Sequence, residues 1–118
     1  MANILVIDDN DDLRGVLQEI LQRAGYNVIA ASSGQEGVDA YRKEPADLVI
    51  TDMIMPNMGG AEVIRDLQKD FPDVNIITFT GGDMGGEGNL SEIPNVKYSF
   101  KKPFDMKEVK EAVREIVG

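Results

Sequence analysis

Five short apolar runs divide the chain, and most neighbouring runs are separated by a segment long enough for a helix. The runs cover residues 3–7, 27–31, 48–51, 76–80 and 96–100. Several of the segments between them repeat apolar residues with the 3.6-residue period of a helix. Strands joined through helices pair in parallel. The runs Leu5-Val6-Ile7 and Leu48-Val49-Ile50 are apolar at consecutive positions, which is typical of strands covered on both faces. The pattern predicts an α/β fold with a doubly wound, five-stranded parallel sheet.

Four segments carry the signals of regular helices. Residues 13–24 place their apolar side chains along one stripe that stops at Gly25, with Asp11 or Asp12 as the expected N-cap. Further helices are predicted over residues 34–44, 62–71 and 106–117, the first behind Ser33 and the last behind Asp105. Helices in these positions would cover both faces of the sheet.

The segment between the last two runs departs from the alternation. Five glycines fall between Gly81 and Gly88, and each costs a helix interior about 1 kcal/mol relative to alanine. We expect at most a short helical turn over residues 89–93, before Pro94. We also expect residues 81–94 to be the part of the domain least protected from hydrogen exchange.

The last apolar run has the alternating pattern of a strand with one exposed face. Val96, Tyr98 and Phe100 are apolar or aromatic, whereas Lys97 and Ser99 between them are polar. Such alternation indicates a strand at the edge of the sheet, with the three larger side chains on its covered face.

Charge and composition exclude several classes of function. The 118 residues include 12 Lys and Arg against 21 Asp and Glu, a net charge of −9, so neither direct nucleic-acid binding nor membrane binding is expected. The chain has no cysteine and no histidine, so neither thiolates nor imidazoles can carry its chemistry. Apolar runs of about four residues are too short for a signal sequence or a membrane span. We expect one cytoplasmic domain over residues 1–118.

Acidic residues crowd directly after the first apolar run, where the sequence reads DDNDD from Asp8 to Asp12. Crowded carboxylates raise each other's pKa unless a cation lies among them. In an open parallel sheet, ligands bind at the carboxyl ends of the strands. The groups expected at that edge are Asp8, Asp9, Asp52, Thr80 and Lys102. Three carboxylates, a hydroxyl and an ammonium group are suited to binding Mg²⁺ together with a phosphoryl group.

These residues also carry a resemblance to a known family. The pair Asp8-Asp9, the stretch DMIMPNMGG from Asp52, the pair Thr80-Gly81 and Lys102-Pro103-Phe104 resemble the receiver domain of two-component response regulators, of the chemotaxis-regulator type. The resemblance spans the whole chain and implies a flavodoxin-like sheet with strand order 2-1-3-4-5. It implies a phosphoacceptor domain that takes a phosphoryl group from a histidine kinase or phosphotransfer protein and switches conformation to signal.

The resemblance further implies a role for each site residue. Asp52 would accept the phosphoryl group, and Asp8, Asp9, Asp52 and the backbone carbonyl of Ile54 would hold Mg²⁺. Such a domain catalyses its own phosphoryl transfer and hydrolysis and is a signalling module, not an enzyme with a separate substrate. Its signal would pass to an output partner or to an effector domain outside this sequence.

Two further residues complete the implied site, and one position departs from the family pattern. Thr80 would hydrogen-bond one phosphoryl oxygen and Lys102 would pair with another, with a cis bond between Lys102 and Pro103. Ser99 lies three positions before the lysine, where receiver domains often have an aromatic switch residue. Tyr98 is adjacent but should point to the opposite face of the strand. We therefore expect a switch in which Thr80 moves inward and orders the glycines that follow it.

A calcium-binding module is one alternative function. The residues Asp8, Asn10, Asp12 and Glu19 match most of an EF-hand loop. However, Leu13 occupies the sixth position, where the sharp turn of such a loop needs glycine.

An aspartyl phosphatase is a second alternative, with Asp8 as the nucleophile. Such enzymes have a D-x-D arrangement after the first strand, whereas Asp9 and Asn10 follow Asp8 here. A flavin-binding module of similar architecture would need a phosphate-binding loop of small residues at this point, where this chain has acids. The two phosphoryl hypotheses differ in the residue that carries the covalent phosphate.

Overall fold

The computed structural model describes residues 2–80, 95–101 and 104–118. Its five strands pair in parallel in the order β2-β1-β3-β4-β5, as the sequence and the resemblance predicted. The strands are β1 (Asn3–Ile7), β2 (Asn27–Ala31), β3 (Leu48–Asp52), β4 (Ile76–Thr80) and β5 (Val96–Lys101). The turn expected over residues 89–93, and the low protection expected for 81–94, lie outside the described residues.

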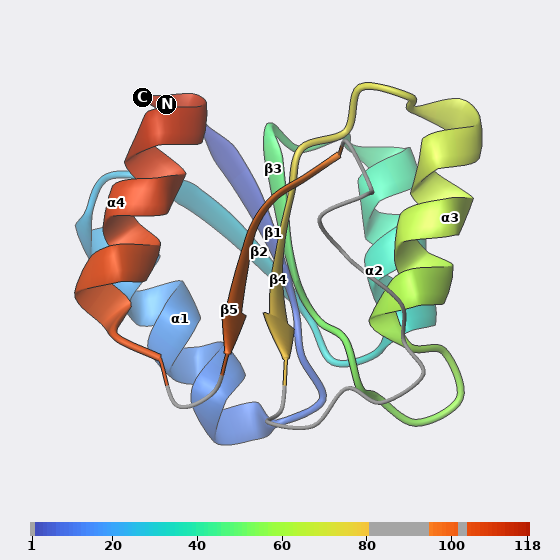
Figure 1. The fold of residues 1–118 in the computed structure, drawn as a ribbon, viewed down its shortest axis with the longest axis horizontal. Coiled ribbons are helices and arrows are strands. Elements are labelled where there is room, and N and C mark those ends of the chain that lie inside the picture. The colour runs from blue at the N-terminus through green and yellow to red at the C-terminus, as the bar shows by residue number, and fades with distance from the viewer. Residues whose placement is uncertain (1, 81–94, 102–103) are drawn as a thin grey trace.

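Four helices in the described ranges cover the two faces of the sheet. They are α1 (Asp11–Arg23), α2 (Gly34–Lys43), α3 (Gly60–Asp70) and α4 (Met106–Val117). Helices α1 and α4 lie on one face, and α2 and α3 lie on the other (Figure 1). None of the four is long and apolar enough to cross a bilayer.

Among the described residues, the buried apolar side chains form two clusters, one on each face of the sheet. Strands β1 and β3 send alternate residues to the two sides, which is why their sequences are continuously apolar. On the side of α1 and α4 the cluster includes Ile4, Val6, Leu17, Leu21, Leu48, Ile50, Phe79, Val109 and Val113. On the side of α2 and α3 it includes Leu5, Ile7, Val38, Tyr41, Val49, Val63, Ile64 and Leu67. Both central strands are thereby fixed, with their carboxyl ends at the same edge.

The start of α1 differs from the prediction. Asn10 is the N-cap, and its side-chain oxygen accepts a hydrogen bond from the Leu13 amide at 3.0 Å. Asp11 and Asp12, one of which was expected to cap the helix, lie in its first turn, where acids still favour the positive end of the helix dipole. Asparagine and aspartate cap helices equally well, so residue type does not decide which of these positions is the N-cap. The N-cap is instead set by the point at which the chain leaves β1 and turns into the helix.

The apolar stripe of α1 is only partly buried. Leu17 and Leu21 are fully enclosed, but the Val16 side chain is 45% exposed, and Ala24 is exposed at the helix C-cap. The helix and its end before Gly25 are as predicted, and the apolar stripe is wider than the face of α1 that is covered.

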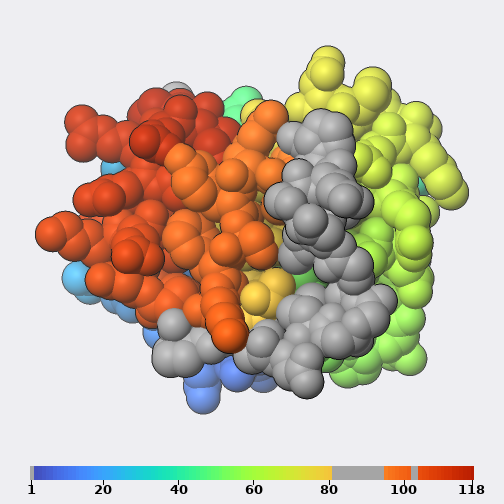
Figure 2. Space-filling model, viewed as in Figure 1, coloured from blue at the N-terminus to red at the C-terminus, as the bar shows by residue number. Residues whose placement is uncertain are grey.

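Strand β5 forms the other edge of the sheet, as its alternation predicted. It lies beside β4 and reaches the surface next to α4 (Figure 2). Lys97 and Ser99 are exposed, whereas Tyr98 and Phe100 pack against the cluster on the side of α1 and α4. The exposed and the covered positions of these four residues are thus as expected.

A β-bulge in β5 corrects the prediction for its first residue. Val96 is opposite Ile76, but Tyr98 is opposite Ile77, so Lys97 is an extra residue in the ladder. The bulge reverses the alternation between Val96 and Tyr98. Val96 consequently packs against the cluster on the side of α2 and α3, away from the face that Tyr98 occupies.

Candidate functional site

Two adjacent strands deliver carboxylates to one edge of the sheet. Ile7 is opposite Thr51 in the register of β1 and β3, so the next residues, Asp8 and Asp52, leave the sheet side by side. Asp8 is 1% exposed and Asp52 is 5% exposed, whereas Asp9 lies at the surface. Each of the three offers a carboxylate oxygen, and these oxygens all lie within 4.8 Å of one another. Such a set of hard, anionic oxygen atoms fits a divalent cation such as Mg²⁺.

The turn after β1 is held by a short series of hydrogen bonds. The Asp8 amide donates to the Ala31 carbonyl at 3.1 Å and so continues the ladder between β1 and β2. The Asp8 carboxylate accepts from the Asn10 amide at 2.9 Å, and the Asn10 side chain caps α1. Asp8 is thus oriented by the same residue that starts the helix.

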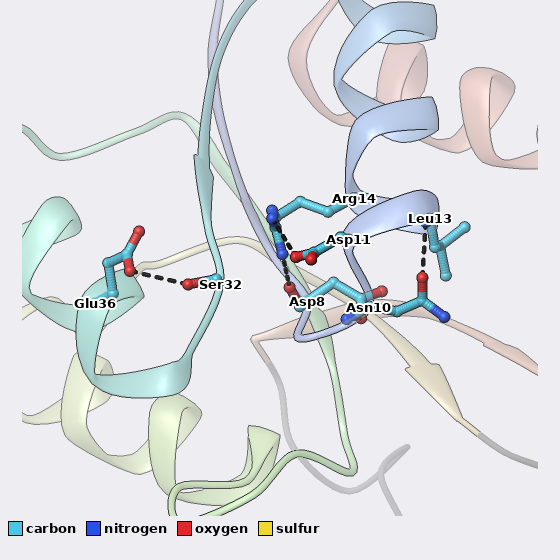
Figure 3. Close-up of polar contacts among 7 residues, drawn as sticks. All are labelled: Asp8, Asn10, Asp11, Leu13, Arg14, Ser32 and Glu36. Carbon is cyan, nitrogen blue, oxygen red and sulfur yellow. Dashed lines mark hydrogen bonds and ion pairs between the residues drawn. The ribbon is translucent and has the colours of Figure 1, made fainter.

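Arg14, which the sequence analysis did not single out, also contacts this turn. Its guanidinium donates to the Asp8 backbone carbonyl at 2.9 Å and to the Asp11 carboxylate at 2.6 Å (Figure 3). An arginine in the first turn of a helix is an ordinary surface residue by sequence alone. Only the direction in which α1 leaves β1 brings its side chain back over the acidic turn.

The loop after β3 returns the chain to the site. The Ile54 amide donates to the Asp52 carboxylate at 3.2 Å, so the Ile54 backbone lies beside that carboxylate. The Met53 amide continues the sheet by donating to the Phe79 carbonyl at 3.0 Å. Met53 and Met55 are buried and Met58 packs at the margin of the core, as expected for methionines with a packing role.

Gly60 determines how closely α3 approaches the end of β3. Its amide donates to the Met53 carbonyl at 3.0 Å. A Cβ atom at this position would lie 2.7 Å from the Asp52 carbonyl oxygen and 2.8 Å from the Met53 Cα. Both are backbone atoms of the segment that carries the central carboxylate. The glycine pair before the helix was the available signal, and α3 begins there, two residues before the predicted start.

Thr80 ends β4 next to the site. Its side chain is buried, and its hydroxyl donates to the Phe100 carbonyl of β5 at 3.5 Å, the long limit for a hydrogen bond. Because this hydrogen bond is long, the Thr80 hydroxyl can donate to another acceptor at little cost in free energy. Lys102, and the Lys102–Pro103 bond that was expected to be cis, lie outside the described residues.

Ser99 and Tyr98 point to opposite faces of β5, as predicted. The Thr78 hydroxyl, which is fully buried, donates to the Ser99 hydroxyl at 2.9 Å. The Tyr98 hydroxyl bonds to Glu115 on α4, and its ring stacks near that of Phe100. The position three residues before Lys102 is therefore occupied by a hydroxyl pair between β4 and β5.

The geometry does not support an EF-hand loop. Asp8 follows a strand, and Asp12 and Glu19 both lie within α1. A regular helix extends away from its first residue by 1.5 Å per residue, so these acids cannot wrap around one ion with Asp8.

Comparison with known proteins gives a consistent result. A family model described as the response regulator receiver domain matches residues 4–114. The chain is 31% identical to sporulation initiation phosphotransferase F of Bacillus subtilis (strain 168), over 95% of this chain and 90% of that protein. It is 29% identical to the response regulator receiver protein CpdR of Brucella abortus (strain 2308), over 99% of this chain and 98% of that protein.

Solved structures agree with these matches. The response regulator TrrA from Thermotoga maritima, in complex with Mg²⁺-BeF, superposes with a TM-score of 0.87 at 33% identity, covering 99% of this chain and all of that one. A chain in the complex of histidine kinase ThkA with TrrA superposes with a TM-score of 0.85 at 32% identity, covering both chains fully.

Proposed function

The chain belongs to the response regulator receiver domain family, and we propose on this basis that Asp52 is its phosphoacceptor in a two-component phosphorelay. The donor would be the phosphohistidine of a histidine kinase or phosphotransfer protein. The observation that carries the assignment is the approach of the Asp8, Asp9 and Asp52 carboxylates within 4.8 Å, with Asp52 at the end of the central strand β3. Neither the calcium-binding module nor the phosphatase is favoured.

The same carboxylates, with the Ile54 carbonyl, are the proposed ligands of Mg²⁺. The donor chemistry supports this, and the similar protein TrrA was solved with Mg²⁺-BeF. When bound, Mg²⁺ would neutralise charge on the phosphoryl oxygens. The Asp52 carboxylate can attack phosphorus directly while the P–N bond of the donor breaks. No general base is required, which is compatible with a chain that lacks histidine.

Thr80 and Lys102 would bind the transferred group. We propose that the Thr80 hydroxyl leaves the Phe100 carbonyl, to which it is weakly bonded, and donates to a phosphoryl oxygen. Lys102 would pair with another oxygen, so that the developing charge is neutralised from two sides. Transfer and later hydrolysis would both occur on the domain itself.

The proposed partner that phosphorylates the domain is a histidine kinase, as in the complex of ThkA with TrrA. A cytoplasmic location is part of the same proposal. The output partner would be a protein or an attached effector domain, because the net charge of −9 opposes direct contact with nucleic acid.

Mapping of the covalent phosphate tests the proposal. The protein is incubated with a small-molecule phosphodonor and Mg²⁺, digested at low temperature, and analysed by mass spectrometry. We expect the acyl phosphate on Asp52. A phosphoryl group on Asp8 would instead support an aspartyl phosphatase and contradict the assignment.

Mg²⁺ is expected to stabilise the folded domain. A ligand that binds only the folded state adds RT ln(1 + [L]/Kd), about 2.7 kcal/mol at a concentration of 100 Kd. Asp9→Ala should remove most of this gain at little cost to the fold, because Asp9 is exposed. The measurement is urea unfolding followed by circular dichroism, with and without Mg²⁺.

The matched control is Asp12→Ala, which removes an exposed acid from the first turn of α1. It should retain the full response to Mg²⁺. A response that is unchanged in Asp9→Ala would argue against the proposed ligand set. Preference for Ca²⁺ over Mg²⁺ would favour the calcium-binding alternative.

A further inference from the structure

Arg14 makes two contacts with the acidic turn after β1 that the proposed chemistry does not use. Its Nη1 donates to the Asp8 carbonyl at 2.9 Å, and its Nη2 donates to the Asp11 carboxylate at 2.6 Å (Figure 3). Its side chain is 20% exposed, compared with 79% for Arg23, which pairs with Glu19 on the same helix. Arg14 is thus packed against the turn, whereas Arg23 forms an ordinary surface ion pair.

The Asp8 carbonyl has a particular position in the site. It belongs to the peptide that joins Asp8 to Asp9, the two proposed metal ligands from this turn. Because a peptide is planar, a hydrogen bond that fixes its carbonyl also fixes the plane and the amide on its other side. Asp8 is additionally held through its own amide and its carboxylate. The direction of the exposed Asp9 side chain follows from how this peptide is oriented.

We infer that Arg14 is a positioning residue for the metal site. It orients the Asp8–Asp9 peptide so that the Asp9 carboxylate points to the same cation position as those of Asp8 and Asp52. Arg14 thereby sets the affinity for Mg²⁺ and, through it, the concentration of Mg²⁺ needed for phosphoryl transfer. This inference rests on the proposed function of the three carboxylates.

The positive charge of Arg14 has the opposite effect on the affinity for Mg²⁺ from its positioning role. The direction in which the affinity changes when Arg14 is removed therefore tests the inference. A guanidinium close to a cation site weakens cation binding by Coulomb repulsion, and the ion pair with Asp11 reduces that effect. If charge alone mattered, removal of Arg14 would tighten Mg²⁺ binding. If Arg14 positions the turn, its removal weakens binding.

The test uses Arg14→Met, which removes both the charge and the donors but retains a flexible side chain. Groups that orient metal ligands from outside the coordination sphere change affinity by roughly 10- to 100-fold. We expect the Kd for Mg²⁺, measured by calorimetric titration of the full chain with MgCl₂, to rise about tenfold. At saturating Mg²⁺, the rate of Asp52 phosphorylation by a small-molecule phosphodonor should return close to the wild-type value.

Arg23→Met is the matched control, since it removes the same charge from the far end of α1. It should leave the Kd for Mg²⁺ unchanged. A purely structural role for Arg14 would lower the free energy of unfolding without Mg²⁺ but would not change the Kd of the folded protein. A Kd for Arg14→Met that equals that of Arg23→Met, or is lower, overturns the inference.

Arg14→Lys provides a second comparison that retains the charge. Lysine can donate one hydrogen bond to the Asp8 carbonyl but lacks the planar fork. We expect its Kd to lie between those of wild type and Arg14→Met. If Arg14→Lys binds Mg²⁺ as tightly as wild type, or more weakly than Arg14→Met, the inference is overturned. The comparison of Arg14→Lys with wild type can be made even if Arg14→Met does not fold. If the wild-type protein binds no Mg²⁺, the proposed function is overturned together with the inference. If the wild type binds Mg²⁺ and the variants do not differ as expected, only the inference on Arg14 fails.

Discussion

The Asp52→Asn variant is expected to take up no phosphoryl group under conditions that label the wild type, whether the donor is a small phosphorylated molecule or an autophosphorylated histidine kinase. An asparagine amide has the shape of the carboxylate but no anionic oxygen to attack phosphorus. Loss of a nucleophile reduces such reactions by several orders of magnitude, so labelling should fall below detection. Intact-protein mass spectrometry measures the result directly.

The fold of this variant should be retained, because the substitution is isosteric and the Ile54 amide can still donate to the side-chain oxygen. Without Mg²⁺, its free energy of unfolding should equal or exceed that of the wild type, since one of three crowded negative charges is removed. Asp12→Asn is the control for a change of charge on the same edge and should be labelled normally. A phosphoryl group that persists in Asp52→Asn would show that another residue is the acceptor.

Gly60→Ala is expected to lower the free energy of unfolding by about 3 kcal/mol, at the upper end of the cost of inserting a methyl group into a packed core. The new Cβ would lie 2.7 Å from the Asp52 carbonyl oxygen and 2.8 Å from the Met53 Cα. These two backbone atoms, at the end of β3 and in the residue that follows it, cannot yield as a flexible side chain can. The strain should therefore displace Asp52 and slow phosphorylation of the remaining folded protein.

Gly15→Ala provides the matched control in α1. Apart from the adjoining backbone of α1 itself, no atom of the residues that the structure describes lies within 4 Å of the Cβ that it would add, and the position is exposed. Alanine in a helix interior is favoured over glycine, so this variant should gain about 0.5–1 kcal/mol. If the close approach at Gly60 causes the destabilisation, urea unfolding should show changes in the free energy of unfolding that have opposite signs in the two variants. A Gly60→Ala variant as stable as wild type would mean that α3 can move away from β3 without cost.

Much of the fold could be predicted because its signals are local. Continuous apolar runs indicated strands covered on both faces, and β1 and β3 are covered in that way. Ser33 and Asp105 were recognised as N-caps because a capping side chain bonds amides only two or three residues away. The convergence of Asp8, Asp9 and Asp52 also followed from the sequence, since parallel strands must end at one edge.

Other features depended on distances between elements, for which a single sequence has no direct signal. The bulge at Lys97 arises from the pairing of β5 with β4, and it moves Val96 to the face opposite Tyr98. The apolar pattern of α1 likewise did not show which of its residues would be covered, and Val16 is 45% exposed. In both cases the local sequence pattern predicted the right type of element. Which of its side chains are covered depends on the neighbouring elements that pack against it.

The parallel sheet, its helices and the gathering of three carboxylates could all be inferred from residue patterns, because periodicity and the alternation of strands and helices act through the chain's own connectivity. The orientation of those carboxylates, in contrast, depends on contacts between elements. The contact of Arg14 with the Asp8 carbonyl, and the close approach that requires glycine at position 60, depend on the directions in which α1 and α3 leave the sheet. Those directions are set by packing on both faces of the sheet, which joins residues far apart in the chain.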